Sequence, residues 1–253
     1  MLYLIFLNGQ DFIELPDLPE AVANNVVTDA MVSGVKYIYS FSGIDSTKQF
    51  SGIHKKAFRY NTATKIWDRI NDLPSGNGRI AAAASTVKNK IYILGGYEVF
   101  SGGGESSFDK VHAYDPETNE YLEDGMPIPI PIDDQVQAVY KDSLIYVVTG
   151  WSNNGNVADV QIYDPANDSW STGTPVPNTV DYKVFGASGA ILGDTLYYIG
   201  GARSGASFPA TTFSRKGYII PDNPTDIEWS GVSGIPAARC YRAAAFSNNE
   251  AII

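Results

Sequence analysis

The sequence predicts an all-β protein made of one repeated, four-stranded antiparallel sheet. Two observations support this fold class. A short apolar run that ends in glycine occurs four times, and the glycines Gly43, Gly96, Gly150 and Gly201 are separated by 53, 54 and 51 residues. Each copy is followed by a segment with the composition of a β-hairpin. A fixed period of this kind indicates a repeat architecture and outweighs local propensity.

The first half of the clearest copy, residues 79–121, predicts a hairpin. A strand is expected at residues 80–86, followed by a Lys-Asn-Lys turn and a second strand at residues 91–94. The second strand stops at Gly95 and Gly96. Glycine permits positive φ angles and lets neighbouring backbones approach closely.

The second half of this copy predicts another hairpin. A third strand is expected at residues 110–114, and the turn Asp115-Pro116-Glu117-Thr118-Asn119 follows it. Proline sets φ for the turn, while Asp and Asn close it through side-chain hydrogen bonds. Two linked hairpins make one four-stranded sheet. Aromatic pairs mark this hairpin seven residues apart at Tyr60 and Trp67, Tyr114 and Tyr121, and Tyr163 and Trp170, whereas the fourth pair, Tyr218 and Trp229, predicts an insertion of four residues.

The paired glycines, the Tyr-Asp-Pro turn and the Trp seven residues later resemble the kelch repeat, whose period is about 50 residues. This resemblance covers nearly the whole chain and implies a β-propeller, in which sheets, called blades, pack around a central axis. We expect one propeller domain over residues 10–253, six-bladed at full length. Its expected parts are four complete blades at about 24–74, 75–129, 130–178 and 179–236, an incomplete blade at 237–253, and a closing strand of the last blade at 10–19.

Residues 1–9 are interpreted as a truncated leader. Residues 2–7 are apolar and are followed by small polar residues, but they lack the basic start and the full length of an export signal. An edge strand or a misassigned start is the alternative. Kelch proteins of this plain kind are often exported in bacteria, so the resemblance favours a periplasmic or extracellular location over a cytoplasmic one.

The composition disfavours several classes of protein. The 18 basic and 28 acidic residues give a net charge of −10, which opposes sequence-independent binding to nucleic acid phosphates. The single cysteine, Cys240, rules out an internal disulfide framework and a Cys-based zinc site. No apolar run approaches the roughly 18 residues of a membrane span. We therefore expect no nucleic-acid partner and no transmembrane segment.

A catalytic metal centre is not expected. Galactose oxidases share the repeat fold, and that resemblance would imply copper held by histidines, tyrosines and a tyrosine cross-linked to cysteine. The two histidines, His54 and His112, lie at matching places in different blades, and copper favours imidazole ligands. Cys240 and Tyr241 are adjacent on one expected strand and so point to opposite faces. With no G-x-S-x-G motif either, we expect no metal, no cofactor and no catalytic triad.

Polar residues begin each innermost strand, and these starts gather at one mouth of a propeller channel. Arg79, preceded by Asn77 and Gly78, resembles the Arg-bearing inner-strand start that kelch adaptor domains use to hold acidic peptides. A guanidinium offers a fixed fork of donors to a carboxylate. The structural alternative is that such arginines pair with Asp134 or with carbonyls of the rim. The expected mouth residues are Asn77, Arg79, Asp133, Asp134, Tyr182, Lys183, Arg239 and Arg242.

A second candidate site is the row of loops that follows the repeating glycines. Trp151 comes directly after Gly150 and stands beside Ser152, Asn153 and Asn154. An aromatic ring among amides suits saccharide contact, although a rim tryptophan that packs on its own loop is an equal alternative. The matching loop positions are Tyr97 and Arg203.

Two function classes remain. The first is a non-catalytic binding propeller that presents its polar mouth to a protein or saccharide. The second is a carbohydrate-active enzyme resembling the bacterial sialic acid mutarotases, exported kelch propellers that need only an acid/base pair. Glu98, Glu105, Asp133 or Asp134, with an arginine, would then supply acid/base catalysis and carboxylate anchoring. Only the repeat of that family is matched, so the non-catalytic class is the preferred prediction.

Overall fold

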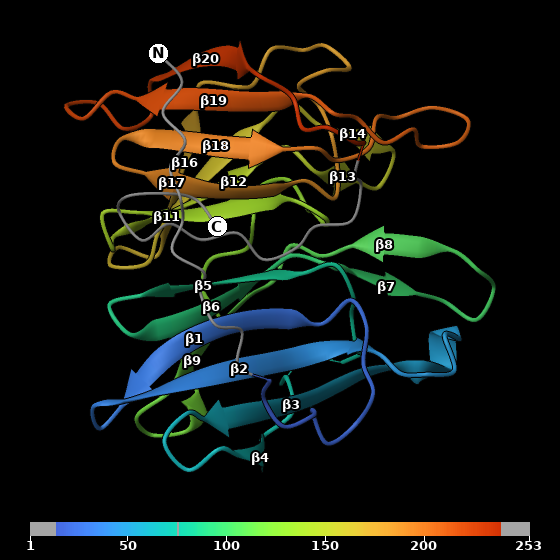
Figure 1. The fold of residues 1–253 in the computed structure, drawn as a ribbon, viewed down its shortest axis with the longest axis vertical. Coiled ribbons are helices and arrows are strands. Elements are labelled where there is room, and N and C mark those ends of the chain that lie inside the picture. Colours follow the sequence, from blue (N-terminus) through green and yellow to red (C-terminus); the bar gives the residue numbers. More distant parts are fainter. Residues whose placement is uncertain (1–13, 75, 239–253) are drawn as a thin grey trace.

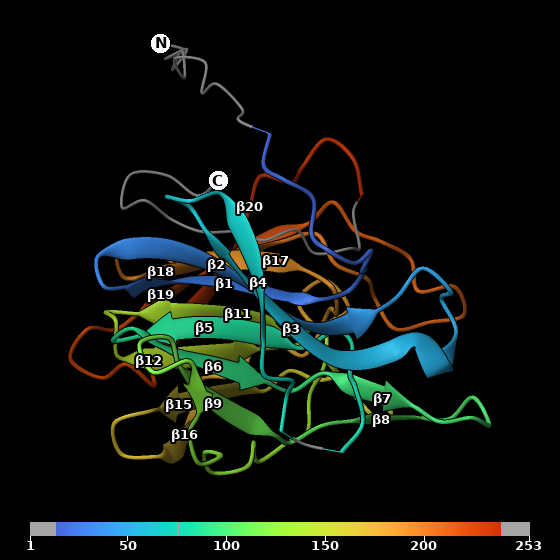
Figure 2. The same cartoon turned by 90° about the horizontal axis from the view of Figure 1, so that it is seen from below.

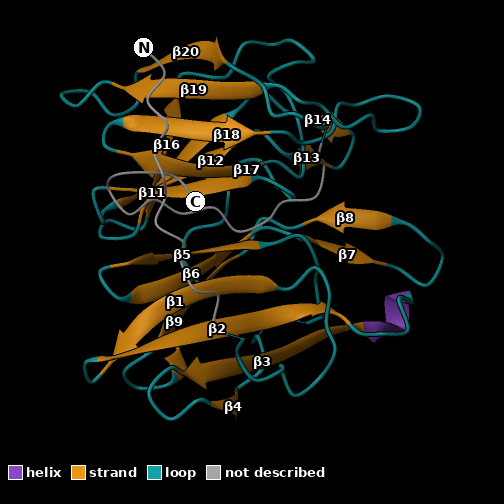
Figure 3. Cartoon of the chain, viewed as in Figure 1, coloured by secondary structure: helices purple, strands orange, loops and turns teal. Residues whose placement is uncertain are grey.

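The computed structural model describes residues 14–74 and 76–238. These residues form four four-stranded antiparallel sheets and two short two-stranded hairpins (Figure 1). Figure 3 shows that the remaining segments are loops and turns apart from one short 3-10 helix. The prediction of an all-β fold with four complete blades is therefore confirmed.

Each blade is a series of consecutive antiparallel strands, and its first strand is the innermost. Blade 1 contains β1 (Val26–Val32), β2 (Val35–Ile44), β3 (Ile53–Asn61) and β4 (Ile66–Ile70), and blade 2 contains β5 (Ala83–Val87), β6 (Lys90–Leu94), β9 (Val111–Asp115) and β10 (Glu120–Tyr121). Blade 3 contains β11 (Val136–Tyr140), β12 (Leu144–Val148), β15 (Val160–Asp164) and β16 (Ser169–Gly173), and blade 4 contains β17 (Ser188–Leu192), β18 (Thr195–Ile199), β19 (Ser214–Ile219) and β20 (Ile227–Val232).

The blades pack side by side around a shared hollow, as expected for a propeller. β1 lies against β5, β5 against β11, and β11 against β17 (Figures 1 and 2). The hollow between these inner strands has a volume of about 350 Å³ and is lined mainly by small and amide side chains. The number of six blades in the complete ring stays a prediction.

The connections after the second strands lie at one end of the blades, which we call the loop face. It carries the 3-10 helix η1 (Phe50–Gly52) of blade 1, the hairpin of β7 (Tyr97–Val99) and β8 (Glu105–Ser107), and the hairpin of β13 (Trp151–Ser152) and β14 (Gly155–Asn156). Figure 3 shows these three features on the same side of the molecule, beyond the ends of the sheets.

In the first three blades, the repeating glycine at the end of the second strand links its blade to the next one by a backbone hydrogen bond. Gly96 has a φ of +89°, and a Cβ there would lie 2.8 Å from the carbonyl oxygen of Ile80. The expected need for positive φ and close approach is thus met at this position. The backbone N–H of Gly43 donates to the carbonyl of Arg79 (3.1 Å), that of Gly96 to Ile132 (2.9 Å), and that of Gly150 to Val184 (2.9 Å).

Aromatic residues of the third and fourth strands pack against each other within each of the first three blades. Their ring centroids are 5.2 Å apart for Tyr60 and Trp67, 5.1 Å for Tyr114 and Tyr121, and 4.9 Å for Tyr163 and Trp170.

Blade 4 departs from this pattern. Gly217, and not Tyr218, pairs with Trp229 across β19 and β20. Tyr218 points away from the core and is 42% exposed. A Cβ on Gly217 would lie 2.5 Å from the ring of Trp229, so that ring takes the space of the missing tyrosine. The prediction that Tyr218 occupies the repeat position is therefore wrong, because Gly217 stands opposite Trp229 as Tyr60 stands opposite Trp67 in blade 1.

A second set of hydrogen bonds lies at the outer edge of the blades. The aromatic residue of each fourth strand donates a hydrogen bond to the carbonyl that stands three residues before Pro19, Pro74, Pro129 or Pro177. Residues 14–19 contain no strand, yet they occupy the same place beside blade 1 that blade exits occupy elsewhere. The four bonds are Trp67 to Pro16 (2.9 Å), Tyr121 to Asn71 (3.1 Å), Trp170 to Met126 (2.9 Å) and Trp229 to Thr174 (3.0 Å).

Several predictions fall outside the described residues. They include the leader at 1–9, the first part of the closing strand at 10–13, and residues 239–253 with Arg239, Cys240 and Arg242. The exported location stays a prediction. Within the described ranges, no helix is long and apolar enough to cross a membrane.

We expect Gly95→Ala to weaken the junction between blades 2 and 3. Gly95 has a φ of +64°, and a Cβ there would lie 2.2 Å from the carbonyl oxygen of Ile132. Left-handed strain and this clash should lower the free energy of unfolding by at least about 2 kcal/mol, measured by urea denaturation. Gly102→Ala, where no atom lies within 4 Å, is the control and should change it by less than about 0.5 kcal/mol. Equal stabilities of the two variants would contradict the proposed role of the glycine pair.

Candidate functional site

A polar pocket opens on the loop face between the β7–β8 and β13–β14 hairpins. Its volume is about 240 Å³. Asp133 comes from the expected mouth residues, whereas Tyr97 and Trp151 come from the expected loop row, so the structure joins two separately predicted groups in one site. The full lining is Tyr97, Gly103, Glu105, Ser107, Asp133, Trp151 and Asn153.

Hydrogen bonds hold the two hairpins in a fixed relation. The backbone N–H of Ser107 donates to Asn153 Oδ1 (3.0 Å), and the N–H of Asn153 donates to Ser107 Oγ (3.0 Å). Ser107 Oγ also donates to Asp133 Oδ2 (2.6 Å). Asn153 adopts a φ of 45°, which asparagine tolerates better than most residues. The two loops that form the pocket are therefore hydrogen-bonded to each other.

Burial and nearby acidic residues affect the Tyr97 hydroxyl. Burial raises the pKa of the Tyr97 hydroxyl, and the negative charges of Glu105, Asp134 and Asp133 raise it further. Asp133 is only 3% exposed, whereas Glu105 is exposed at the pocket edge. Tyr97 therefore remains a neutral hydroxyl at physiological pH.

Trp151 is held in place by two other rings. Its ring centroid lies 5.7 Å from that of Phe185 and 5.6 Å from that of Phe208, both in edge-to-face geometry. This arrangement combines the two alternatives considered for Trp151, because the ring packs on neighbouring loops and also lines the pocket. Aromatic pairs of this geometry restrict the ring positions.

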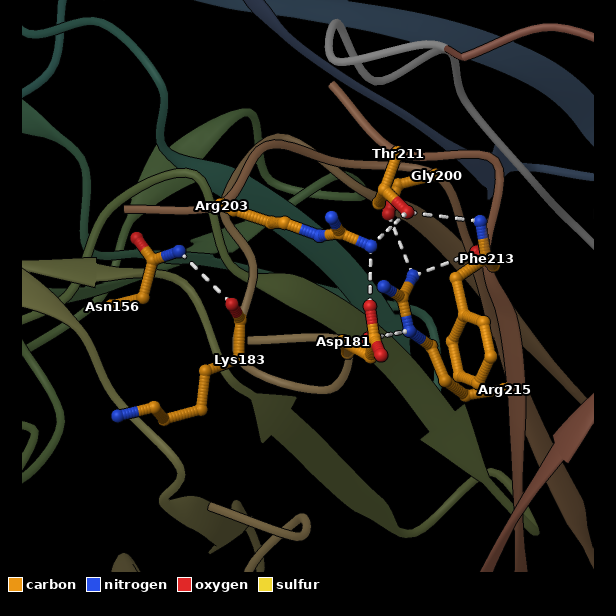
Figure 4. Close-up of polar contacts among 8 residues, drawn as sticks. All are labelled: Asn156, Asp181, Lys183, Gly200, Arg203, Thr211, Phe213 and Arg215. Carbon is orange, nitrogen blue, oxygen red and sulfur yellow. Dashed lines mark hydrogen bonds and ion pairs between the residues drawn. The ribbon is translucent and has the colours of Figure 1, made fainter. Parts of the chain in front are cut away.

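Two basic residues of blade 4 were expected in the site, Lys183 at the mouth and Arg203 in the loop row (Figure 4). Arg203 Nη2 forms an ion pair with Asp181 Oδ1 and lies 3.5 Å from Thr211 Oγ1. The carbonyl of Lys183 accepts a hydrogen bond from Asn156 Nδ2 (3.1 Å), and its side chain extends away from the Arg203–Asp181 pair. Neither Arg203 nor Lys183 lines the pocket.

Arg79 lies in the interior, which differs from the expectation of a guanidinium at the mouth. It is 1% exposed, and its Nη1 donates to the carbonyl of Gly95 (2.8 Å). The guanidinium stands over the ring of Phe108, 5.5 Å from its centroid. Burial lowers the pKa of Arg79 to about 10, so it stays charged at neutral pH. Arg79 thus holds the glycine pair through the carbonyl of Gly95. Contact with a backbone carbonyl is the structural alternative that was considered for this residue.

Arg215 makes the equivalent contact in blade 4 and was not predicted. It is fully buried, and its Nη1 donates to the carbonyl of Gly200 (2.7 Å), the counterpart of Gly95 (Figure 4). Its Nε donates to the carbonyl of Asp181 (2.5 Å). Arg79 reaches this carbonyl from the segment before β5, whereas Arg215 reaches it from β19. An arginine in the middle of an otherwise buried strand was the signal that could have identified it.

Three other expected mouth residues within the described ranges contact neighbouring residues. Asn77 Nδ2 donates to Glu98 Oε2 (2.7 Å). The backbone of Asp134 links three blades, because its N–H donates to Ala81 and its carbonyl accepts from Gly186. The ring of Tyr182 packs edge-on against Phe213 at 5.7 Å between centroids. Asp134 thus connects neighbouring blades, whereas Asn77 and Tyr182 contact residues of their own blades.

A row of buried polar side chains occupies one repeat position on the third strands. Gln161 bridges the backbone of Ile130, accepting from its N–H (2.8 Å) and donating to its carbonyl (3.0 Å). His112 Nδ1 contacts Asp124 Oδ1 at 2.6 Å, and Arg215 fills the position in blade 4. Burial and the charge of Arg79 lower the pKa of His112 to about 4, against the opposing effect of Asp124.

The two histidines considered for copper lie on the third strands of different blades, His54 on β3 and His112 on β9. In the ranges 14–74 and 76–238, no group of three or more His, Cys, Asp or Glu side chains is arranged to hold a metal ion. The expectation of no metal and no cofactor stays a prediction.

Comparison with known proteins gives one family and a common fold. Residues 28–253 match the family described as the KLHDC2/KLHL20/DRC7 Kelch-repeats domain. The chain is 25% identical over 173 residues to Kelch-like protein 26 of Mus musculus, covering 68% of this chain and 27% of that protein. It is 25% identical over 211 residues to Kelch-like protein 25 of Xenopus tropicalis, with coverages of 80% and 32%. The chain therefore spans only about a third or less of these relatives.

The fold is also similar to a solved structure, that of YjhT. The TM-score is 0.72 at 20% sequence identity, over 93% of this chain and 72% of that one. At this identity the likeness concerns the fold.

We expect His112→Gln to reduce the loss of stability at acidic pH. Folded His112 has a pKa of about 4, below its ordinary 6.5, so the unfolded chain alone takes up this proton between those values. Stability is therefore lost as the pH falls from about 6.5 toward 4. Gln161 shows that glutamine fits this strand position. From pH 7.5 to 5, urea denaturation should show the wild type losing about 2 kcal/mol more than the variant. Parallel pH profiles would contradict the assignment.

Proposed function

The chain belongs to the KLHDC2/KLHL20/DRC7 Kelch-repeats domain family, and from this premise we propose that it is a non-catalytic domain that binds a protein partner on its loop face. The observation that carries the proposal is the polar pocket between the two hydrogen-bonded hairpins. Binding residues commonly stand on loops that a rigid scaffold positions.

The surroundings of the pocket favour a protein over a small molecule. Phe50, Phe100 and Phe208 are 48%, 46% and 50% exposed, and they lie on three different connections of the loop face. Exposed aromatic residues are enriched in protein interfaces and often provide most of the binding energy. The pocket volume of about 240 Å³ is also below the range of about 300–1,000 Å³ that is usual for whole small ligands.

The catalytic alternative has one supporting observation, since Glu105 and Asp133 line the same pocket and could act as an acid/base pair. Two of the arginines predicted for this mouth do not anchor a substrate carboxylate in the described part of the chain, because Arg79 is buried on Gly95 and Arg203 is paired with Asp181. The binding function is therefore the better supported of the two.

The proposal is tested by selecting random peptides displayed on phage against the immobilised wild-type protein. Enriched peptides should bind the Phe100→Asp and Phe208→Asp variants at least about tenfold more weakly, because the charge disrupts the aromatic surface of the loop face. Ile66→Asp is the matched control: Ile66 is 56% exposed but lies beside the turn at the opposite end of blade 1, and this variant should bind normally. Melting curves verify that each variant is folded.

Two results would overturn the proposal. One is peptide binding that survives both loop-face substitutions and is lost in Ile66→Asp. The other is a rate of N-acetylneuraminate anomer exchange, followed by NMR, that rises in proportion to the protein concentration, which would establish the catalytic alternative.

A further inference from the structure

We propose that Asn154, at the tip of the β13–β14 hairpin, is a site of spontaneous deamidation, and that the isoaspartate formed there releases this hairpin from the β7–β8 hairpin. The inference goes beyond the proposed function, because it concerns a covalent change in the chain itself. It starts from the sequence pair Asn154-Gly155. Glycine has no Cβ, so its backbone nitrogen can approach the preceding side chain closely.

The reaction needs only the chain and water. The backbone nitrogen of Gly155 forms a bond to Cγ of Asn154, the bond from Cγ to the side-chain nitrogen breaks, and that nitrogen leaves as ammonia with the proton of the Gly155 N–H. Water then opens the cyclic succinimide. Addition of water at Cγ gives aspartate, whereas addition at the α-carbonyl gives isoaspartate, in which the main chain runs through the side-chain carbons. Either product carries a negative charge at neutral pH.

The surroundings of Asn154 leave room for this ring closure. Asn154 is exposed and stands in the turn between β13 and β14, where Ser152 pairs with Gly155. Its side-chain amide has no hydrogen-bond partner within residues 14–74 and 76–238. Apart from its chain neighbours, the nearest atom to a Cβ on Gly155 would be Ser204 Oγ, at 3.9 Å. The amide and the Gly155 backbone can therefore rotate toward each other without displacing another residue.

A second Asn-Gly pair in the described chain provides an internal comparison. Asn77 is also exposed, but its Nδ2 donates to Glu98 Oε2 (2.7 Å). Gly78 is packed against β3, since a Cβ there would lie 2.5 Å from the backbone nitrogen of His54. A held amide and a crowded glycine oppose the reaction, because the reacting atoms must first reach an aligned close approach. The structure thus distinguishes two sites that the sequence pattern treats alike.

The tip of the hairpin lies between two anchored residues. Asn153 exchanges two hydrogen bonds with Ser107 of the β7–β8 hairpin, each of 3.0 Å. On the other side of the tip, Asn156 Nδ2 donates to the carbonyl of Lys183 (3.1 Å), as Figure 4 shows. Isoaspartate adds a carbon atom to the main chain between these anchors, so both cannot keep their positions. Because Asn153 lines the pocket, the shape of the pocket should change as the protein ages.

The test is incubation of the folded full chain at mildly alkaline pH, followed by peptide mass spectrometry. Isoaspartate is marked with a protein isoaspartyl methyltransferase, and fragment spectra locate each modified residue. This separates the signal of the third pair, Asn8 and Gly9, which lies outside the described residues. Asn154 should be converted at least about fivefold faster than Asn77, because release of one hydrogen bond already accounts for a factor of this size. In urea the two rates should agree within about twofold, because the folded surroundings are lost.

Two variants serve as matched controls for the effect on the hairpin. Asn154→Gln keeps the amide but closes the ring slowly, and Asn154→Asp carries the new charge without the longer main chain. Amide hydrogen exchange at Ser107 and Asn153, followed by NMR, should be at least about tenfold faster in the isoaspartate form than in either variant. Anion-exchange chromatography separates the deamidated protein, and methylation identifies its isoaspartate fraction.

The inference is overturned if Asn77 reacts as fast as Asn154 in the folded chain, or if the product at Asn154 contains no isoaspartate. It is also overturned if hydrogen exchange at Ser107 and Asn153 is the same in the isoaspartate form and in Asn154→Gln. Each of these results is independent of whether the loop face binds a protein, so a failure here leaves the proposed function standing.

Discussion

The propeller depends on the hydrogen bond from the repeating glycine N–H to the carbonyl that stands four residues before the inner strand of the next blade. It recurs at Gly43, Gly96 and Gly150, and each time it joins the end of a second strand to the start of the following inner strand. Burial of apolar side chains favours contact between sheets but has no direction. The backbone bond supplies the direction and so fixes how far each blade is turned relative to its neighbour. Only glycine serves well there, because the φ is positive and a Cβ would collide with the backbone.

The pocket is a product of the same junction. Tyr97 and Trp151 each follow a repeating glycine directly, and each pairs with the start of its own inner strand, at Ile80 and Asp133. The backbone positions of both aromatic residues are therefore set by the blades and not by the loops that extend beyond them. The hairpins can differ in length and side chains without disturbing this frame, which is how one fold supports many binding specificities.

Periodicity predicted the strands, the glycine roles and the aromatic hairpin pairs of three blades, because these features repeat and depend on local spacing. The direction of Arg79 could not be predicted in the same way. Ala81, two residues later, has a φ of 57°, and Asp134 has a φ of 48° at the same repeat position. A left-handed residue breaks the alternation from which side-chain directions are inferred in a strand. The link between Ser107 and Asn153 was equally out of reach, because it joins two loops that are remote in sequence.

At the outer edge, a tryptophan or tyrosine of a fourth strand donates a hydrogen bond to the backbone that follows the preceding blade. This contact bears on how the number of blades can change in evolution. Its acceptor is a main-chain carbonyl, as is the acceptor of the glycine bond on the inner side. Each blade thus carries its own donors and requires no particular side chain from the blade beside it at these two points. An array joined in this manner can gain a copy of one blade by duplication, since the newcomer brings both of its attachments and its neighbours already offer the matching oxygens.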